Sequence, residues 1–217
     1  TNYVLGLEGK SGNPSPFTAY GTFLGMKAAL NHQRGIQDFS GIKVAVQGLG
    51  AVAYGLCKHL SEAGAELFVT DINQAAVDRV ANDFGATAVG IDEIYDLDVD
   101  VYAPCALGAT INDTTIPRLK ATIVAGCANN QLAESRHGEI LREKGILYAP
   151  DYVINAGGII NVYYETAPEG YSKEASNKHV ERIYDTLSEI FTRSEKEQKS
   201  THLIADELAQ EIIENGL

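Results

Sequence analysis

The segment that decides the fold is Val44-Ala45-Val46-Gln47-Gly48-Leu49-Gly50-Ala51-Val52-Ala53. Its apolar start is typical of a buried parallel strand, and the residues that follow continue in a helical pattern up to Gly64. The turn between them has the spacing Gly-x-Gly-x-x-Ala. In dinucleotide-binding turns the first glycine permits the tight turn, the second lets the backbone approach a pyrophosphate, and the small third residue lets the helix pack close to the strand. The segment therefore predicts a strand, a phosphate-binding turn and a helix.

A second strand and an acidic residue strengthen this prediction. Leu67 to Thr70 form another apolar run, and Asp71 follows it about 20 residues after the turn, where a carboxylate binds the adenosine ribose in dinucleotide sites. Ile72 and Asn73 come next, without an arginine or lysine that would favour a 2′-phosphate. We therefore expect NAD rather than NADP. The alternative is a glycine-rich turn in some other doubly wound protein.

The rest of the chain alternates between strand and helix patterns. We expect further strands at 86–89, 99–103, 122–125 and 146–148, and helices at 14–34, 73–84, 91–95, 112–119, 134–144 and 158–165, followed by two amphipathic helices separated near 199–201. This alternation indicates an α/β fold: a doubly wound Rossmann-type, mostly parallel sheet with helices on both faces and a C-terminal helical tail. We divide the chain into a linker (1–16), an NAD-binding domain (17–171) and the helical tail (172–217).

Small and amide residues gather where these strands end. They occupy 48–53, 104–107, 128–131 and 155–158. Ligands of such sheets bind beyond the carboxyl ends of the strands. Small residues there would let a flat cofactor lie close to the backbone, and amides can both donate and accept hydrogen bonds. The four segments therefore predict one site at one edge of the sheet.

Composition excludes several classes of protein. The 217 residues carry a net charge of −12, with 45% hydrophobic and 21% charged residues, which is typical of a globular domain and disfavours nucleic acid and anionic membranes as partners. The three cysteines form no C-x-x-C pair, which suggests reduced thiols in a cytoplasmic protein. Metal-binding and hydrolase motifs such as H-E-x-x-H and G-x-S-x-G are absent, so we assign no metal. Gly9-Lys10-Ser11 matches the end of the P-loop motif, but position 4, where the motif requires its first glycine, is Val4. We therefore interpret this segment as a flexible connection.

Several long motifs resemble one enzyme family. They are 11–21 (SGNPSPFTAYG), 46–54 (VQGLGAVAY), 69–73 (VTDIN), 102–108 (YAPCALG), 128–132 (ANNQL) and 148–158 (YAPDYVINAGG). Together they resemble the glutamate, leucine, phenylalanine and valine dehydrogenases, and the leucine dehydrogenase branch in particular. The resemblance implies the cofactor-binding half of a clamshell enzyme. Such enzymes convert an L-amino acid to its 2-oxo acid and ammonia while NAD takes up a hydride.

The resemblance also implies roles for individual residues. The first group would bind the cofactor: Thr18, Gly48, Leu49, Gly50, Ala51, Val52, Ala53, Asp71, Ile72, Cys105, Ala106, Ala128, Asn129 and Asn155. Ile159 and Val162 would shape the pocket for the substrate side chain. The chain departs from the family pattern at 163–169 and 196–202, which bears on pocket shape and subunit packing.

The family's catalytic lysine motifs have no counterpart in this sequence. We therefore assign no catalytic residue and expect a piece of a longer polypeptide whose N-terminal substrate domain is missing, with a homo-oligomer as the full-length form. The partners would be a small L-amino acid and its 2-oxo acid. A non-catalytic dinucleotide-sensing module is the alternative outside enzymes, and a phenylalanine or valine dehydrogenase is the alternative within them. One methylene changes such pockets by only about 1–3 kcal/mol, so Ile159 and Val162 favour an aliphatic substrate only weakly.

Overall fold

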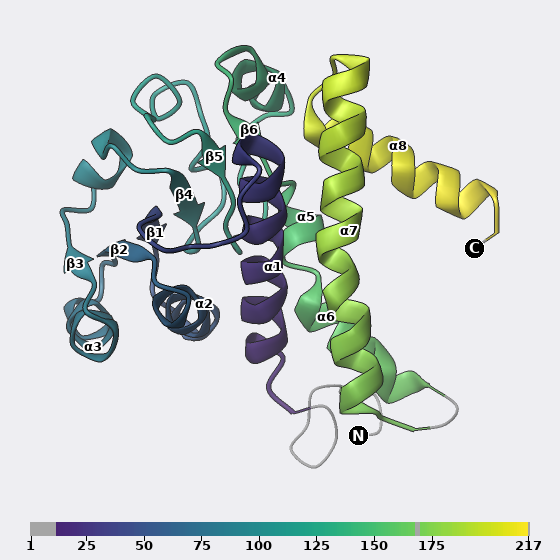
Figure 1. The fold of residues 1–217 in the computed structure, drawn as a ribbon, viewed down its shortest axis with the longest axis horizontal. Helices are drawn as coiled ribbons and strands as arrows, with labels where there is room; N and C mark the ends of the chain where they lie inside the picture. The colour runs from purple at the N-terminus through teal and green to yellow at the C-terminus, as the bar shows by residue number, and fades with distance from the viewer. Residues whose placement is uncertain (1–11, 168–169, 217) are drawn as a thin grey trace.

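A parallel sheet lies at the centre of the computed structural model, which describes residues 12–167 and 170–216 (Figure 1). Its six strands follow the order β3-β2-β1-β4-β5-β6, and every neighbouring pair is parallel. The order reverses between β1 and β4, the place where ligands bind in doubly wound sheets. The strands are β1 (Lys43–Gln47), β2 (Glu66–Thr70), β3 (Thr87–Ala88), β4 (Val101–Pro104), β5 (Ile123–Val124) and β6 (Leu147–Tyr148).

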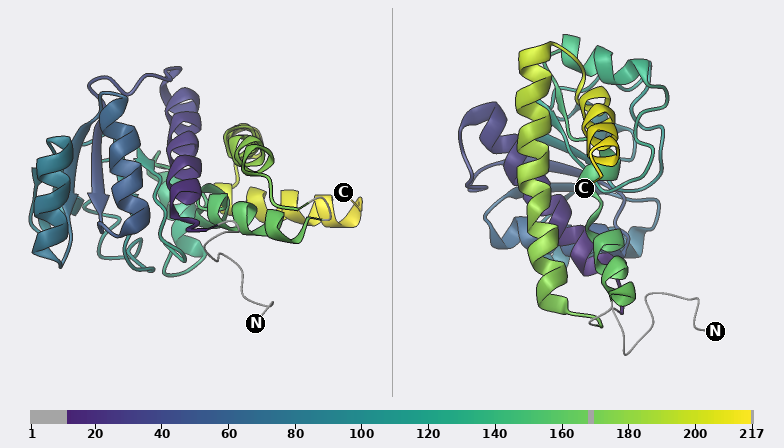
Figure 2. Two further views of the ribbon diagram at one scale, coloured as in Figure 1. Left: turned by 90° about the horizontal axis from the view of Figure 1, so that it is seen from below. Right: turned by 90° about the vertical axis from the view of Figure 1, so that its right-hand side faces the viewer.

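Helices lie in most of the connections between these strands and cover both faces of the sheet (Figure 2). The expected doubly wound fold is therefore confirmed. The helices are α1 (Ser15–Arg34), α2 (Ala51–Glu62), α3 (Gln74–Phe84), α4 (Arg136–Glu143), α5 (Asp151–Ile154), α6 (Gly157–Tyr163), α7 (Lys173–Glu197) and α8 (Thr201–Glu214), with short 3₁₀ helices η1 (Glu93–Asp96) and η2 (Tyr164–Thr166).

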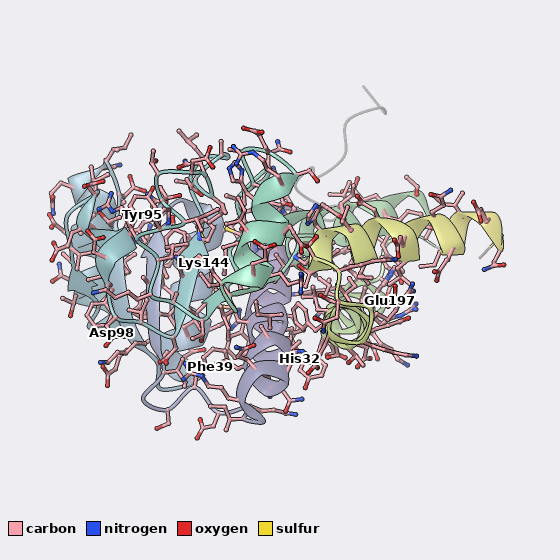
Figure 3. All side chains as sticks on the ribbon, turned by 90° about the horizontal axis from the view of Figure 1, so that it is seen from above. His32, Phe39, Tyr95, Asp98, Lys144 and Glu197 are labelled. Atoms are coloured by element: carbon pink, nitrogen blue, oxygen red, sulfur yellow. The ribbon has the colours of Figure 1, made fainter. Side chains whose placement is uncertain are left out.

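The two faces of the sheet form two hydrophobic clusters. Successive strand residues point to opposite faces, so Val44 and Val46 pack on one side while Ala45 packs on the other. The larger cluster joins the sheet to α1, α2, α3 and α7, and the smaller one joins it to η1, α4 and the 111–121 segment. Among the residues labelled in Figure 3, Phe39 is buried in the larger cluster, whereas Asp98 and Glu197 are exposed.

The long helix α7 lies beside α1 and completes the larger cluster (Figure 1). Val180, Ile183 and Leu187 are buried along one face of α7, as the apolar stripe in the sequence predicts. Helix α8 is tied to the sheet where Thr201 Oγ1 donates to the Tyr148 carbonyl at 2.6 Å, and it then projects away from the body (Figures 1 and 2). Among the described residues, no helix is both long enough and apolar enough to cross a membrane.

Two expectations about local structure are wrong. Residues 112–119 form turns and no regular helix, because Asn112 Oδ1 accepts hydrogen bonds from the Thr114 and Thr115 amides and Pro117 has no amide to donate. A short helix that we did not predict, α5, precedes α6. The imitation P-loop at 9–11 lies outside the described residues, and so does most of the proposed linker.

Candidate functional site

The glycine turn connects β1 to α2 and is held tightly by its neighbours. Gly48 has a φ of 94°, in the left-handed region, and its amide donates to the Thr70 carbonyl at 2.8 Å. A Cβ on Gly48 would lie 2.5 Å from the Cβ of Ala106. The loop after β4 therefore lies directly against the turn, and only glycine fits there.

The carboxylate of Asp71 is fixed beside this turn. Its Oδ2 accepts a hydrogen bond from the Leu49 amide at 2.6 Å, and its Oδ1 accepts one from the Asn73 amide at 2.8 Å. Each carboxylate oxygen has a further lone pair, so the group can still accept two hydroxyls in a fixed orientation. Ile72 beside it is 91% exposed, which leaves an apolar side chain free to contact a flat ring.

The N-terminus of α2 is open to an anion. Gly50 caps the helix with ordinary backbone angles (φ −66°, ψ −174°), and neither a side-chain cap nor an acidic residue occupies the first turn. Apart from its chain neighbours, no described residue has an atom within 4 Å of the position that a Cβ on Gly50 would take. Ala51 is exposed, and Ala53 is buried against the core. The free amides of such a turn and the positive end of the helix dipole suit a pyrophosphate. The backbone thus leaves space at Gly50 in front of the positive end of the α2 dipole.

Two amides meet at the other end of the site. Asn155, after α5, donates through Nδ2 to Asn129 Oδ1 at 2.6 Å and to the Cys127 carbonyl at 3.3 Å. This arrangement leaves the Asn155 oxygen and the Asn129 NH₂ group to serve a ligand amide or hydroxyl.

A buried glutamine shapes the loop that carries Asn129. Gln131 is fully buried, and its Nε2 donates to the carbonyls of Gly126 and Ala128 at 2.8 and 3.0 Å. We did not single out Gln131 from the sequence. The available signal was its place in a run of three amides after β5.

The two ends of the site are joined by neighbouring loops. The Ala109 amide donates to the Asn130 carbonyl at 2.7 Å, so the loops after β4 and β5 run side by side. Cys105 is half-buried in the first loop, and Ala128 is buried in the second. The structure thus gathers the turn, Asp71, Ala106, Asn129 and Asn155 along the carboxyl edge of the sheet.

The remaining predicted residues lie on α1 and α6. A Cβ on Gly158 would lie 2.5 Å from Thr18 Oγ1, so Thr18 borders the start of α6. On α6, Val162 is half-buried, whereas Ile159 is 73% exposed. The side chain of Ile159 is therefore not enclosed by the described residues, and the proposed substrate pocket needs a further wall.

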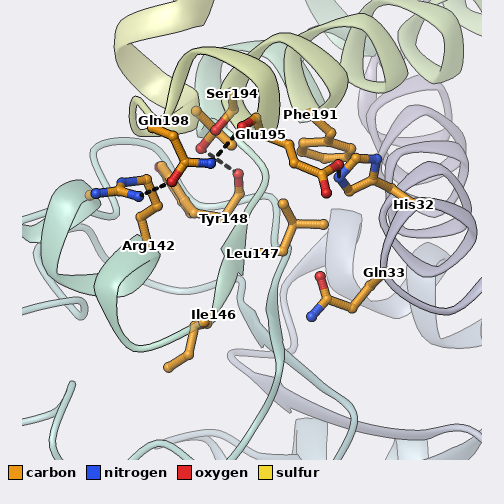
Figure 4. Close-up of a pocket in the computed structure, with 13 residues that line it drawn as sticks. His32, Gln33, Arg142, Ile146, Leu147, Tyr148, Phe191, Ser194, Glu195 and Gln198 are labelled. Carbon is orange, nitrogen blue, oxygen red and sulfur yellow. Dashed lines mark hydrogen bonds and ion pairs between the residues drawn. The ribbon is translucent and has the colours of Figure 1, made fainter.

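Two other polar groupings lie apart from this site. A pocket of about 410 Å³ lies between α1, α4, β6 and α7 (Figure 4), but none of its lining residues belongs to the predicted set. Its charged groups are largely paired, for example His32 with Glu195 at 3.6 Å.

Asp113, Glu134 and His137 form the second grouping, in which three side chains come close enough to hold a metal ion. Arg136 already binds both carboxylates, at 2.6 and 3.0 Å. Its hydrogen bonds, followed by that of His137, lower the pKa of Asp113 to about 2. This geometry is that of an ion-pair cluster.

The fold and this edge together define a Rossmann-type domain with a dinucleotide-binding turn. The family comparison gives the particular group: the chain belongs to the glutamate/leucine/phenylalanine/valine dehydrogenase family, whose model matches residues 65–213.

Individual relatives agree with this assignment. The chain is 55% identical to leucine dehydrogenase from Bacillus cereus over 98% of its length and 58% of the relative's. It is 50% identical to L-tryptophan dehydrogenase from Nostoc punctiforme, and the crystal structure of that protein matches with a TM-score of 0.91 over 94% of this chain and 62% of the other. The chain therefore spans about three fifths of the length of these relatives. A hetero-hexameric glutamate dehydrogenase from Thermus thermophilus, at 22% identity and a TM-score of 0.74, shares the fold.

Proposed function

We propose that this chain is the NAD-binding part of an L-amino-acid dehydrogenase. The whole enzyme would convert leucine or another branched-chain amino acid to its 2-oxo acid and ammonia. The observation that carries the proposal is the pairing of Asp71 with the Leu49 amide, beside the open backbone of Gly50. This places a ribose-binding carboxylate next to a pyrophosphate cradle, which is the arrangement that dinucleotide sites share.

The cofactor would lie along the carboxyl edge of the sheet. In this proposal the residues of the turn hold the pyrophosphate, and Asp71 accepts the adenosine ribose hydroxyls. The loops at Cys105–Ala106 and Ala128–Asn129 line the path to the nicotinamide, where Thr18 and Asn155 bind. When bound, NAD supplies the hydride acceptor, and this chain's residues position its ring.

Helix α6 and the relatives support the proposed substrate class. Ile159 and Val162 offer aliphatic side chains on α6, where we propose that the substrate side chain binds, and this supports a branched-chain substrate. The relatives carry the names leucine, L-tryptophan and phenylalanine dehydrogenase, and these names support a substrate with a hydrophobic side chain. We further propose that residues 17–171 form the cofactor domain, that 172–217 form its helical tail, and that the full-length protein is a homo-oligomer.

Binding is tested with two glycine substitutions. Gly50→Val would place its side chain in the pyrophosphate cradle without strain, because the backbone is ordinary and the space is open. Gly90→Val is the matched control, since Gly90 is exposed and lies outside the turn. Calorimetric titration with NAD should show binding by wild type and Gly90→Val and loss of binding by Gly50→Val. Retained affinity in a Gly50→Val variant with an unchanged circular dichroism spectrum would refute the proposed location.

Turnover separates the enzyme from a sensing module. Positioned acid–base groups contribute about 10²–10⁴-fold each, and none is assigned in this chain. The chain alone should therefore bind NAD yet produce no NADH absorbance with a panel of L-amino acids. Activity on adding the separately prepared N-terminal part of the Bacillus cereus relative would support the dehydrogenase. Turnover by the chain alone would reveal a catalytic group that we have not identified.

A further inference from the structure

Two cysteines follow neighbouring strands at the edge where the cofactor would bind. Cys105 comes after β4 and Cys127 after β5, and both are half-buried. Backbone pairing continues past β5, because the Ala128 amide donates to the Pro104 carbonyl at 3.0 Å. A Cβ on Gly126 would lie 2.2 Å from that same carbonyl oxygen, so the two backbones approach unusually closely beside the cysteines.

The two cysteines follow strands that are direct neighbours, because β4 pairs with β5 in the sheet. The nearby Cys105 thiol is the largest influence raising the pKa of Cys127, and burial is the second. Neighbouring strands lie about 4.7–4.9 Å apart, within the Cα separation of about 4.4–6.8 Å that disulfides need. Cys57, the remaining cysteine, is fully buried in α2, where burial raises the pKa of its thiol. Cys105 and Cys127 therefore form the natural pair, and Cys57 serves as an internal control.

The loops that carry these two sulfurs are parts of the proposed site. Ala106, the residue after Cys105, lies against Gly48. A Cβ added to Gly48 would be 2.7 Å from the amide nitrogen of Ala106. The carbonyl of Cys127 accepts from Asn155 Nδ2 at 3.3 Å. A bond between the sulfurs would thus act on the pyrophosphate turn and on the amide pair at once.

We propose that Cys105 and Cys127 form an oxidation-sensitive dithiol that hydrogen peroxide converts to a disulfide, and that this disulfide weakens dinucleotide binding. The second half of this proposal rests on the proposed function, whereas the first half does not. A bond of about 2 Å between the sulfurs would lock the two loops to each other, so the segments that contact Gly48 and Asn155 could no longer adjust to a bound dinucleotide.

The chemistry balances with peroxide as the only oxidant. The Cys105 thiolate attacks one peroxide oxygen, an S–O bond forms as the O–O bond breaks, and the other oxygen leaves as water after taking up a proton. The Cys127 sulfur then attacks the sulfenic acid sulfur of Cys105, forming the S–S bond. The hydroxide that leaves takes the Cys127 proton and becomes a second water. The raised pKa keeps Cys127 protonated and therefore a poor nucleophile towards peroxide, which suits it to the second step.

Thermodynamic linkage makes the effect reciprocal. If the disulfide weakens NAD binding, bound NAD must oppose formation of the disulfide by the same factor. Coupling between two sites is typically about 5–150-fold, so we expect at least about a tenfold loss of NAD affinity on oxidation. Saturating NAD should correspondingly slow the loss of thiols.

The test combines mass spectrometry with calorimetry on the purified chain. Peroxide treatment should remove two hydrogens from the intact mass, give a cross-linked Cys105–Cys127 peptide, and raise the Kd for NAD at least about tenfold, with recovery after dithiothreitol. Cys57→Ala, the matched control, should behave as wild type. Cys127→Ser should give no cross-link and no dithiothreitol-reversible change in Kd.

Each contrary result has a definite meaning. A cross-link to Cys57, or only sulfinic acid at Cys105, would overturn the dithiol. A Cys105–Cys127 disulfide with an unchanged Kd for NAD would overturn the effect on binding. Failure of the reduced wild type to bind NAD would refute the proposed function and the second half of this proposal, while the peptide map would still decide the first half.

Discussion

Substitution of Gly48 by alanine tests the geometry of the turn. At a φ of 94° a residue with a Cβ pays about 1–2 kcal/mol of conformational strain. The new Cβ would also lie 2.5–2.7 Å from the Cβ, Cα and amide nitrogen of Ala106, and overpacking of this kind costs about 1–3 kcal/mol. Alanine also lowers the conformational entropy of the unfolded chain, which stabilises the folded state by about 0.4–1 kcal/mol. We therefore expect Gly48→Ala to lower the free energy of unfolding by about 3 kcal/mol.

Urea unfolding followed by circular dichroism measures this change. Gly50→Ala is the control in the same turn, because its backbone is ordinary and its surroundings are open, and it should change the free energy of unfolding by less than about 1 kcal/mol. A loss below about 1 kcal/mol in Gly48→Ala, similar to the control, would show that the loop after β4 does not press on the turn as described.

Three further substitutions or conditions test other contacts. Gly157→Ala should lower the free energy of unfolding by about 1–3 kcal/mol, measured by urea unfolding, because its Cβ would lie 2.1 Å from the Phe17 carbonyl oxygen and α6 would have to move from α1; Gly90→Ala, at an exposed site, should not. Gln131→Met should cost at least about 1–3 kcal/mol and weaken NAD binding, since it leaves two loop carbonyls without their donor; equal NAD affinity would show that Gln131 does not position the loop. Burial lowers the pKa values of three histidines, so below their ordinary pKa of 6.5 the unfolded chain binds more protons than the folded chain. The urea concentration at the midpoint of unfolding should therefore fall between pH 7 and pH 5, and it should fall less steeply in His202→Gln. A midpoint that does not change with pH would contradict this. The histidines are His59, His179 and His202.

Local signals made the first half of the sheet predictable. The turn at 48–53 and the start of the helix predicted at 73–84 depend on neighbouring residues. Asn73 caps that helix, α3, because its Oδ1 accepts from the Ala75 amide at 3.1 Å. The helix predicted at 112–119 is wrong because the side chains of Asn112 and Thr115 form hydrogen bonds with the backbone that compete with a helix. The spacing of hydrophobic residues gives no sign of this competition.

The contacts within the site were harder to predict, because they join residues that are distant in the chain. The position of Asp71 followed from spacing, but its hydrogen bond from the Leu49 amide depends on how β1 and β2 align. That Cys105 and Cys127 follow neighbouring strands likewise appears only once β5 is known to lie beside β4. The amphipathic stripe of α7 predicted a buried face, but not that α1 would cover it.

The central claim is that Asp71 and the glycine turn bind NAD, and cofactor discrimination tests it most directly. Calorimetric titrations of wild type with NAD and NADP should differ by at least about tenfold in Kd. A charge-assisted hydrogen bond to the ribose is worth about 1.5–3 kcal/mol, and the carboxylate repels a 2′-phosphate. Asp71→Ala should narrow the difference mainly by weakening NAD. Equal affinities of wild type for the two cofactors, or an unchanged preference in Asp71→Ala, would contradict the account.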